Sequence, residues 1–301
     1  VQYEGEESSK NVFYTGAAPN QQAIPATDYY LDELGVKKFA LLGTDYVYPR
    51  TTNKILKQYL IDKGIPETDI FVNYTPFGHS DWSKIVGDVV ALGADGKKVG
   101  VISTINGDAN IGFYKELAAA GIKADDIPVV AFSVGEEELS GLDTKNLVGH
   151  LAAWNYFQSA ESDLNTKFIK KWKAKMGDKR VTNDPMEAHV IGFEMYVKAV
   201  EKAGSTDVDA VRKAMYGIKV PNLTGGTAEM LPNHHLSKPV LIGEIKADGQ
   251  FDIISQTEEV PGDAWTDFLA ESKPLMSDWK SMGCGMYNKN TKTCVQIKSN
   301  Y

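Results

Sequence analysis

Strand-like runs recur about every 30 residues in the first half of the chain, and this repeat limits the fold more than any other feature. Short apolar runs rich in β-branched residues begin near Lys38, Asp69, Val99 and Val129. Between them lie amphipathic segments with helical spacing, at Thr51–Lys63, Asp81–Leu92 and Asn110–Ala120. Strands that alternate with helices at this interval form βαβ units, so the pattern predicts a parallel sheet with right-handed crossovers.

The second half of the chain follows a different pattern. Two long helices are predicted there, at Glu161–Met176 and Asn183–Gly204. The Asp248-Gly249 pair, placed between two β-rich runs at 240–246 and 251–257, predicts a hairpin. No long Pro- or Ser-rich linker separates the two regimes, so we expect two lobes in contact.

The composition argues against several classes of function. The formal net charge is −8, whereas a nucleic-acid-binding protein needs a basic face, so no nucleic-acid partner is expected. The sequence has no apolar run long enough to span a membrane. Its histidines are scattered without metal-ligand spacing, and it has no GxSxG elbow and no P-loop. We therefore expect neither a metal site, nor a cofactor, nor an enzyme.

In an open parallel sheet, ligands bind in the loops that follow the carboxyl ends of the strands. These loops carry phenols, an amide and carboxylates, which suit a small polar ligand: Tyr46, Tyr48, Asn106, Asp108, Glu136 and Glu137. One of the two alternating phenols is expected to pack and the other to face the cleft, and Pro49 favours Tyr48 as the directed one. A structural alternative stays open for the carboxylates, because Asp108 suits a helix cap and 136–138 suit a charged first helical turn.

Only two cysteines are present, Cys284 and Cys294, and nine residues separate them in a polar terminal segment. A disulfide there would staple the terminus by about 2–3 kcal/mol and would indicate an oxidising compartment. Two free thiols are the alternative.

Several segments resemble one known family. The Asp45–Arg50 segment (DYVYPR), followed by an amphipathic helix, resembles the short-amide branch of the type I periplasmic binding proteins. Further motifs narrow the resemblance: NYTPFGHSDW (73–82), STINGDAN (103–110), AFSVGEEEL (131–139), GHLAAWNYF (149–157), VTNDPMEAH (181–189) and NLTGGTAEMLPNHH (222–235). Together they resemble the substrate-binding component of urea ABC transporters, over essentially the whole chain.

The resemblance implies an α/β fold of two doubly wound parallel-sheet lobes joined by three crossovers. Residues 17–148 would form the second, complete lobe. Residues 1–16 and 149–301 would form the remainder of the first lobe, the hinge crossovers and a C-terminal tail. The crossovers would lie near 15–20, 147–156 and 223–239. A further segment upstream of this chain would supply most strands of the first lobe and half of the ligand site.

The resemblance also implies roles for individual residues. Tyr48 is the first choice for a ligand contact, with Asn106 and Asp108 contributing from the third loop. Glu136 matches the acidic ligand contact best, and Glu137 is the alternative if the register shifts by one. Trp154, at the second crossover, would either line the cleft or pack the hinge. No metal and no catalytic residue is implied.

The implied function is a urea receptor that delivers its ligand to ABC permease subunits. Urea has N–H donors and one carbonyl acceptor, so carboxylates and an amide oxygen suit it. A signal peptide outside this chain would export the protein to the periplasm, with a lipid anchor as its one link to the membrane. The alternatives are a short-chain amide or amino-acid binder for transport, or an amide sensor. Glu136 does not separate them, because an ammonium group also needs a carboxylate.

Overall fold

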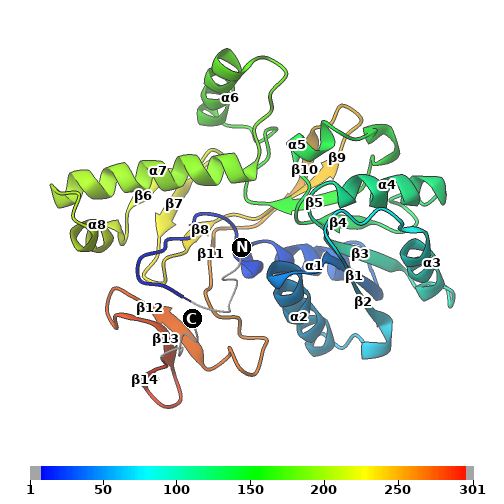
Figure 1. Cartoon of the computed structure of the whole chain (residues 1–301), viewed down its shortest axis with the longest axis horizontal. Coiled ribbons are helices and arrows are strands. Elements are labelled where there is room, and N and C mark those ends of the chain that lie inside the picture. Colours follow the sequence, from blue (N-terminus) through cyan, green and yellow to red (C-terminus); the bar gives the residue numbers. More distant parts are fainter. Residues whose placement is uncertain (1–7, 296–301) are drawn as a thin grey trace.

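The computed structural model describes residues 8–295, and its main element is a seven-stranded mixed sheet (Figure 1). The strand order is β10-β9-β5-β4-β3-β1-β2. The strands are β1 (Lys38–Thr44), β2 (Ile70–Thr75), β3 (Val99–Thr104), β4 (Val129–Ala131), β5 (Leu151–Trp154), β9 (Leu241–Ile245) and β10 (Phe251–Gln256). Strands β1 to β4 are parallel, as the repeat predicted; β5 is a further parallel strand, and β9 and β10 are antiparallel additions at one edge.

Helices cover both faces of this sheet because successive strand residues point to opposite sides. In the fully buried β1, Phe39 and Leu41 belong to the core beneath α1 and α2, whereas Ala40 and Leu42 belong to the core beneath α3 and α4. The helices are α1 (Ala23–Asp32), α2 (Val47–Asp62), α3 (Ser83–Leu92), α4 (Ala109–Ala119) and the one-turn α5 (Glu136–Leu139). Short 3₁₀ turns occupy Pro19–Gln21, Glu67–Asp69 and Thr144–Asn146. The three helices predicted in the first half are confirmed.

The predicted hairpin is also confirmed, and it extends the sheet. Strands β9 and β10 flank the Asp248-Gly249 turn, where Gly249 has a φ of 78° that favours glycine. Strand β9 pairs with β5. The sheet therefore includes residues well beyond the range 17–148, while the division into two lobes stays a prediction.

A second group of elements lies beside the sheet (Figure 1). It contains α6 (Asp163–Met176), α7 (Asp184–Ala203), α8 (Val208–Met215) and a small sheet ordered β11-β8-β7-β6. Its strands are β6 (Lys219–Pro221), β7 (Thr227–Met230), β8 (Leu236–Lys238) and β11 (Val260–Pro261). Met195 and Val211 pack on this sheet through Val220 and Met230. The two long helices predicted in this half are confirmed.

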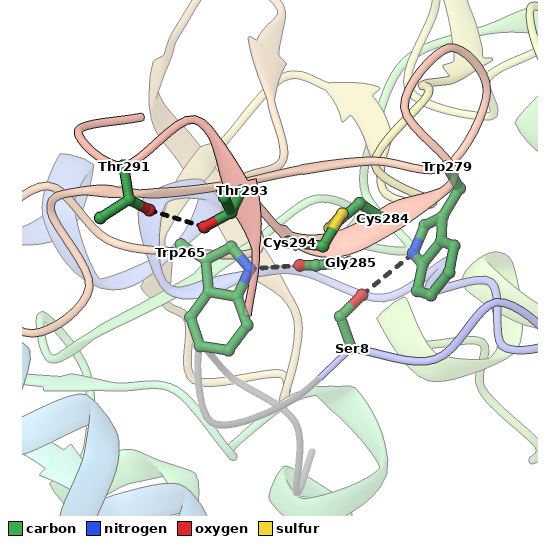
Figure 2. The surroundings of a disulfide bond; sticks show 8 residues. All are labelled: Ser8, Trp265, Trp279, Cys284, Gly285, Thr291, Thr293 and Cys294. Carbon is green, nitrogen blue, oxygen red and sulfur yellow. Dashed lines mark hydrogen bonds between the residues drawn. A yellow bond between two sulfur atoms is a disulfide. The ribbon is translucent and has the colours of Figure 1, made fainter. Parts of the chain in front are cut away.

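The last described residues form a three-stranded sheet of β12 (Leu275–Asp278), β13 (Cys284–Asn288) and β14 (Thr293–Cys294). Figure 2 shows that a disulfide joins Cys284 to Cys294, with the two Cα atoms 6.0 Å apart. The Trp279 indole donates a hydrogen bond to the Ser8 hydroxyl at 3.1 Å. This hydrogen bond connects the first described residue to the C-terminal three-stranded sheet. Within residues 8–295, no helix is both long enough and apolar enough to cross a membrane.

Candidate ligand-binding site

The predicted site residues follow β1, β3 and β4 or, in the case of Trp154, end β5; the carboxyl ends of these strands share one edge of the sheet. The loops after β1 and β3 are joined directly, because the backbone N–H of Asn106 donates to the Thr44 hydroxyl at 2.9 Å. Such an edge is where open α/β sheets bind ligands. The topology thus brings the first, third and fourth loops together as a candidate ligand-binding surface.

Glu136 is the most distinctive group on this edge. Its side chain is buried, with the residue 1% exposed, and its Oε1 accepts a hydrogen bond from the Gln158 backbone N–H at 2.6 Å. Its Oε2 is also buried and has no hydrogen-bond partner among the described residues. Burial raises the pKa of Glu136 to about 8, and the nearby charges of Asp184 and Glu138 add to the shift. A buried carboxylate oxygen without a partner is costly unless a ligand satisfies it.

The other carboxylates of the 136–138 run have local partners. Glu137 faces Arg180 at 3.5 Å and its side chain is 41% exposed. Glu138 accepts a hydrogen bond from the Gly135 backbone N–H at 2.8 Å, as a helix-start residue does. Glu138 therefore acts as a residue of the charged first helical turn, which was the structural alternative. The side chain of Glu136 is instead buried in the protein.

The loop after β3 separates its two candidates. Asn106 is half-buried and its amide nitrogen donates to the Thr104 carbonyl at 2.8 Å, which leaves its oxygen as the group to offer a ligand. Asp108 is exposed at the N-cap of α4 and makes no side-chain cap bond. Asn110, which the sequence reasoning missed, is buried, and its Oδ1 has no partner among the described residues. In the sequence, Asn110 is simply the first residue of a predicted helix, and nothing there indicates that its side-chain oxygen is buried without a partner.

The two phenols occupy different environments. Tyr48 lies in the first turn of α2, is 8% exposed and packs in the core beneath α1 and α2. Tyr46 is half-buried, and its ring meets Tyr48 at 6.0 Å and the exposed Phe77 at 4.9 Å between centroids. The packed phenol is thus Tyr48 and the peripheral one is Tyr46. A contact of Tyr48 with ligand stays a prediction.

Trp154 stands at the end of β5 and holds the loop that leads to Glu136. Its indole N–H donates to the Val134 carbonyl at 2.8 Å, and the ring packs on the core beneath α3 and α4. Trp154 therefore positions the Glu136 backbone.

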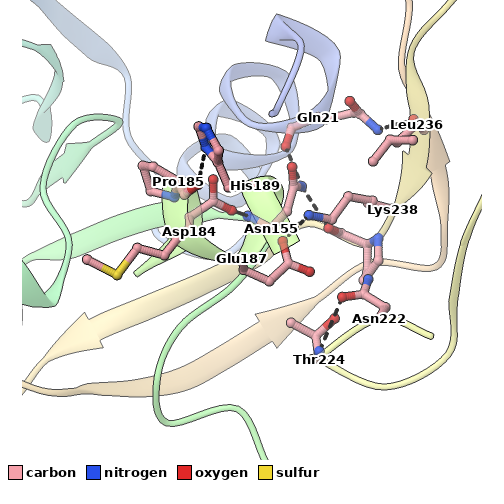
Figure 3. Close-up of polar contacts among 12 residues, drawn as sticks. Gln21, Asn155, Asp184, Pro185, Glu187, His189, Asn222, Thr224, Leu236 and Lys238 are labelled. Carbon is pink, nitrogen blue, oxygen red and sulfur yellow. Dashed lines mark hydrogen bonds and ion pairs between the residues drawn. The ribbon is translucent and has the colours of Figure 1, made fainter. Parts of the chain in front are cut away.

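The next residue, Asn155, lies in the second expected crossover and contacts the end of the third and the residue that follows the first (Figure 3). Its side-chain amide donates to the Gln21 carbonyl at 3.2 Å and to the Pro239 carbonyl at 2.8 Å. Its backbone N–H donates to the Asp184 carboxylate at 3.0 Å. One buried side chain thus joins residues far apart in sequence, which no local pattern could reveal.

Buried charges surround this junction. Glu187 forms an ion pair with Lys238, and both side chains are almost completely buried. Burial raises the pKa of Asp184, against the lowering effect of Lys238, and raises the pKa of Glu187 to about 7. With Glu136 included, this region holds more carboxyl groups than cations, so its electrostatics favour a ligand that donates N–H groups.

Sequence comparisons place the chain among solute-binding proteins. The family model described as "Periplasmic binding protein domain" matches residues 1–271. "Leu/Ile/Val-binding protein homolog 3" of Brucella melitensis is 25% identical over 76% of this chain and 60% of that protein. A match named "Limonene hydroxylase" from Geobacillus stearothermophilus is 30% identical, but over only 46% of this chain and 23% of that protein. The chain therefore spans less than two thirds of the length of these relatives.

Solved structures share the fold at low sequence identity. A substrate-binding protein of an amino-acid ABC transporter from Pseudomonas fluorescens Pf-5 has a TM-score of 0.69 at 20% identity, covering 86% of this chain and 70% of that one. An R. palustris solute-binding protein in complex with 4-hydroxybenzoate has a TM-score of 0.70 at 22% identity, covering 82% and 67%. A periplasmic binding protein from Burkholderia mallei has a TM-score of 0.73 at 16% identity, covering 90% and 70%. By the family match and the fold together, this chain belongs to the periplasmic binding protein family and has its type I fold.

Proposed function

We propose that this chain is the ligand-capturing part of a periplasmic solute receptor that hands its ligand to the permease of an ABC transporter. The family match supports this, as do the transporter-linked titles of the similar structures. The ligand is held at the carboxyl edge of the seven-stranded sheet, between the second lobe (residues 17–148, extended by β5, β9 and β10) and the first lobe. Residues 1–16 and the rest of 149–301 supply the remainder of the first lobe, the hinge crossovers and a C-terminal tail. Asn155 is the pivot of the hinge between the two lobes.

The ligand we propose is urea or a short amide. The observation that carries this proposal is the buried Oε2 of Glu136, an acceptor without a partner among the described residues at the expected edge. Urea supplies N–H donors for this oxygen and for the Asn106 amide oxygen. With four heavy atoms, its binding free energy is limited to about −6 kcal/mol, a Kd near 40 μM.

A second candidate ligand is an amino acid. The name of the Brucella relative and the surplus of carboxyl groups near Lys238 favour it, because an ammonium group would bind well beside Glu136. A ligand with only a carboxylate, in contrast, would be repelled by an ionised Glu136.

Calorimetry on the full-length receptor tests the proposal with urea, acetamide and leucine. Above pH 8, where Glu136 is ionised, urea should bind the parent, and Glu136→Gln should weaken it about 10- to 150-fold, because a buried charge-assisted hydrogen bond is lost. Glu137→Gln is the matched control and should bind like the parent, since Glu137 faces Arg180. If Glu136→Gln binds urea as tightly as the parent, Glu136 does not contact the ligand and has only a structural role.

The pH dependence separates the two ligand classes. An ammonium group needs the ionised carboxylate, so leucine affinity should rise up to about tenfold per pH unit below the Glu136 pKa of about 8. Binding would then release a proton, which calorimetry in two buffers of different ionisation enthalpy detects. Urea is uncharged and can still donate an N–H to the carbonyl oxygen of a protonated Glu136, so its affinity should depend on pH less steeply than that of leucine, with less proton release.

A further inference from the structure

A cavity of about 560 Å³ opens at the amino edge of the seven-stranded sheet, opposite the edge that carries Glu136. Lys98 lines it just before β3, Pro128 just before β4 and Gly149 just before β5. Tyr29 of α1 and Glu244 of β9 close its other side. Its volume falls in the range of about 300–1,000 Å³ that small-molecule sites occupy.

The lysines that line this cavity make no ion pair among the described residues. Lys98, Lys123 and Lys145 line the cavity, and none has a carboxylate within salt-bridge distance among the described residues. Six other lysines between residues 37 and 115 do form ion pairs within the described part of the chain, whereas Lys37 and Lys115 do not; the six are Lys38, Lys54, Lys57, Lys63, Lys84 and Lys97. Asp125 and Glu244 are the carboxylates in the lining, so cations outnumber them. The cavity thus offers free ammonium groups to an anion.

The rest of the lining is apolar or donates hydrogen bonds. Leu34, Ile122 and Leu151 form apolar wall, and Ile254 is 39% exposed at the rim. Burial and the charges of Glu33 and Glu244 raise the pKa of Tyr29, so its hydroxyl stays a donor. Such a lining suits a molecule with an apolar body and an anionic end.

A second cavity of about 480 Å³ adjoins the first, with Ala118 and Asn146 lining both. It runs along α4 and is bordered by Ile111, Leu142 and Leu147. Lys115, which also has no ion pair among the described residues, stands at its side. The apolar surface therefore continues beyond the cationic cavity.

We propose that these adjoining cavities form a second ligand site, for a soluble organic acid with an alkyl or aryl body. The carboxylate of the acid lies among Lys98, Lys123 and Lys145, and the apolar body extends past Ala118 into the second cavity. The site is separate from the edge that carries Glu136 and does not rest on the ligand proposed there.

The test is a calorimetric titration of the complete receptor with octanoate. Octanoate should bind, whereas octyltrimethylammonium, of similar apolar length, and inorganic phosphate should not. Lys98→Gln, at the half-buried lysine, should weaken octanoate at least about tenfold, and Lys145→Gln, at an exposed one, about two- to fivefold. Lys37→Gln is the matched control, because Lys37 is exposed and lies outside both cavities; it should bind like the parent.

Four outcomes would overturn the proposal. If octanoate and octyltrimethylammonium bind equally well, the lysines do not select the ligand. If phosphate binds as well as octanoate, the apolar wall does not contribute to binding. Loss of octanoate binding in Glu136→Gln would place octanoate at the opposite edge; retained binding supports two sites. Phosphatidylglycerol vesicles should leave the protein in the supernatant, and co-sedimentation that Lys98→Gln abolishes would make the partner a lipid surface.

Discussion

Glu187 of α7 and Lys238 of β8 form an ion pair in which the side chains are 0% and 1% exposed. This pair joins α7 to β8 within the second group of elements, just before the chain continues into β9. Removing one partner leaves a buried charge without its counter-ion, which is far more costly than losing a surface pair.

Glu187→Gln should therefore lower the free energy of unfolding by about 3–5 kcal/mol, measured by guanidinium denaturation at pH 8. The double variant Glu187→Gln/Lys238→Met should recover most of the loss. Lys246→Met is the control, because its pair with Asp252 is largely exposed and should contribute less than about 1 kcal/mol. A cost for Glu187→Gln as small as that of the control would contradict this view.

Asn155→Ala tests the junction at the second expected crossover. The substitution removes the donors to Gln21 and Pro239 and leaves both buried carbonyls without them, so a loss of about 2–4 kcal/mol in unfolding free energy is expected. Asn290→Ala, at an exposed asparagine of the β13–β14 turn, should change stability by less than about 0.5 kcal/mol. If both variants unfold at the same denaturant concentration, Asn155 does not hold the junction.

Glu136 should make stability depend on pH. Its ordinary pKa of 4.5 rises to about 8 in the folded protein, so the folded state holds a proton that the unfolded state releases. The stabilisation is complete below pH 4.5 and is lost as the pH rises to about 8. Glu136→Gln should therefore gain about 2–4 kcal/mol relative to the parent between pH 5 and pH 8. Guanidinium denaturation at both pH values measures this, and Glu258→Gln, at an exposed position, should run parallel to the parent.

The cysteine pair gives a covalent prediction. Mass spectrometry after alkylation of native and denatured protein should find no free thiol at Cys284 or Cys294. Reduction should lower the free energy of unfolding by about 2–3 kcal/mol, because it frees a short loop in the unfolded chain. Two alkylated cysteines in unreduced protein would refute the pairing.

The sequence was enough to predict those helices and strands that are specified by a local pattern of residues. The repeat of strands and helices predicted β1 to β4 with α2 to α4, and the Asp248-Gly249 pair predicted the β9–β10 hairpin. It did not reveal that this hairpin pairs with β5, since strand partners separated by about 90 residues leave no local pattern.

The candidate site was predictable to the level of the loop. The sequence does not show which of Glu136 and Glu137 faces inward; in the structure Glu136 is buried and Glu137 pairs with Arg180, and a ligand contact of Glu136 stays a prediction. Asn155 and Lys238 escaped sequence reasoning because their importance lies in partners from distant segments.

The position of β9 and β10 has a consequence for the order of folding. Strand β5 ends at Trp154, yet its neighbour in the sheet starts at Leu241, so one edge of β5 stays unpaired until most of the chain has been synthesised. Such distant pairing slows folding and leaves a strand edge exposed to aggregation in the meantime. The edge of β5 that β9 covers is therefore exposed in any nascent chain that stops short of residue 241.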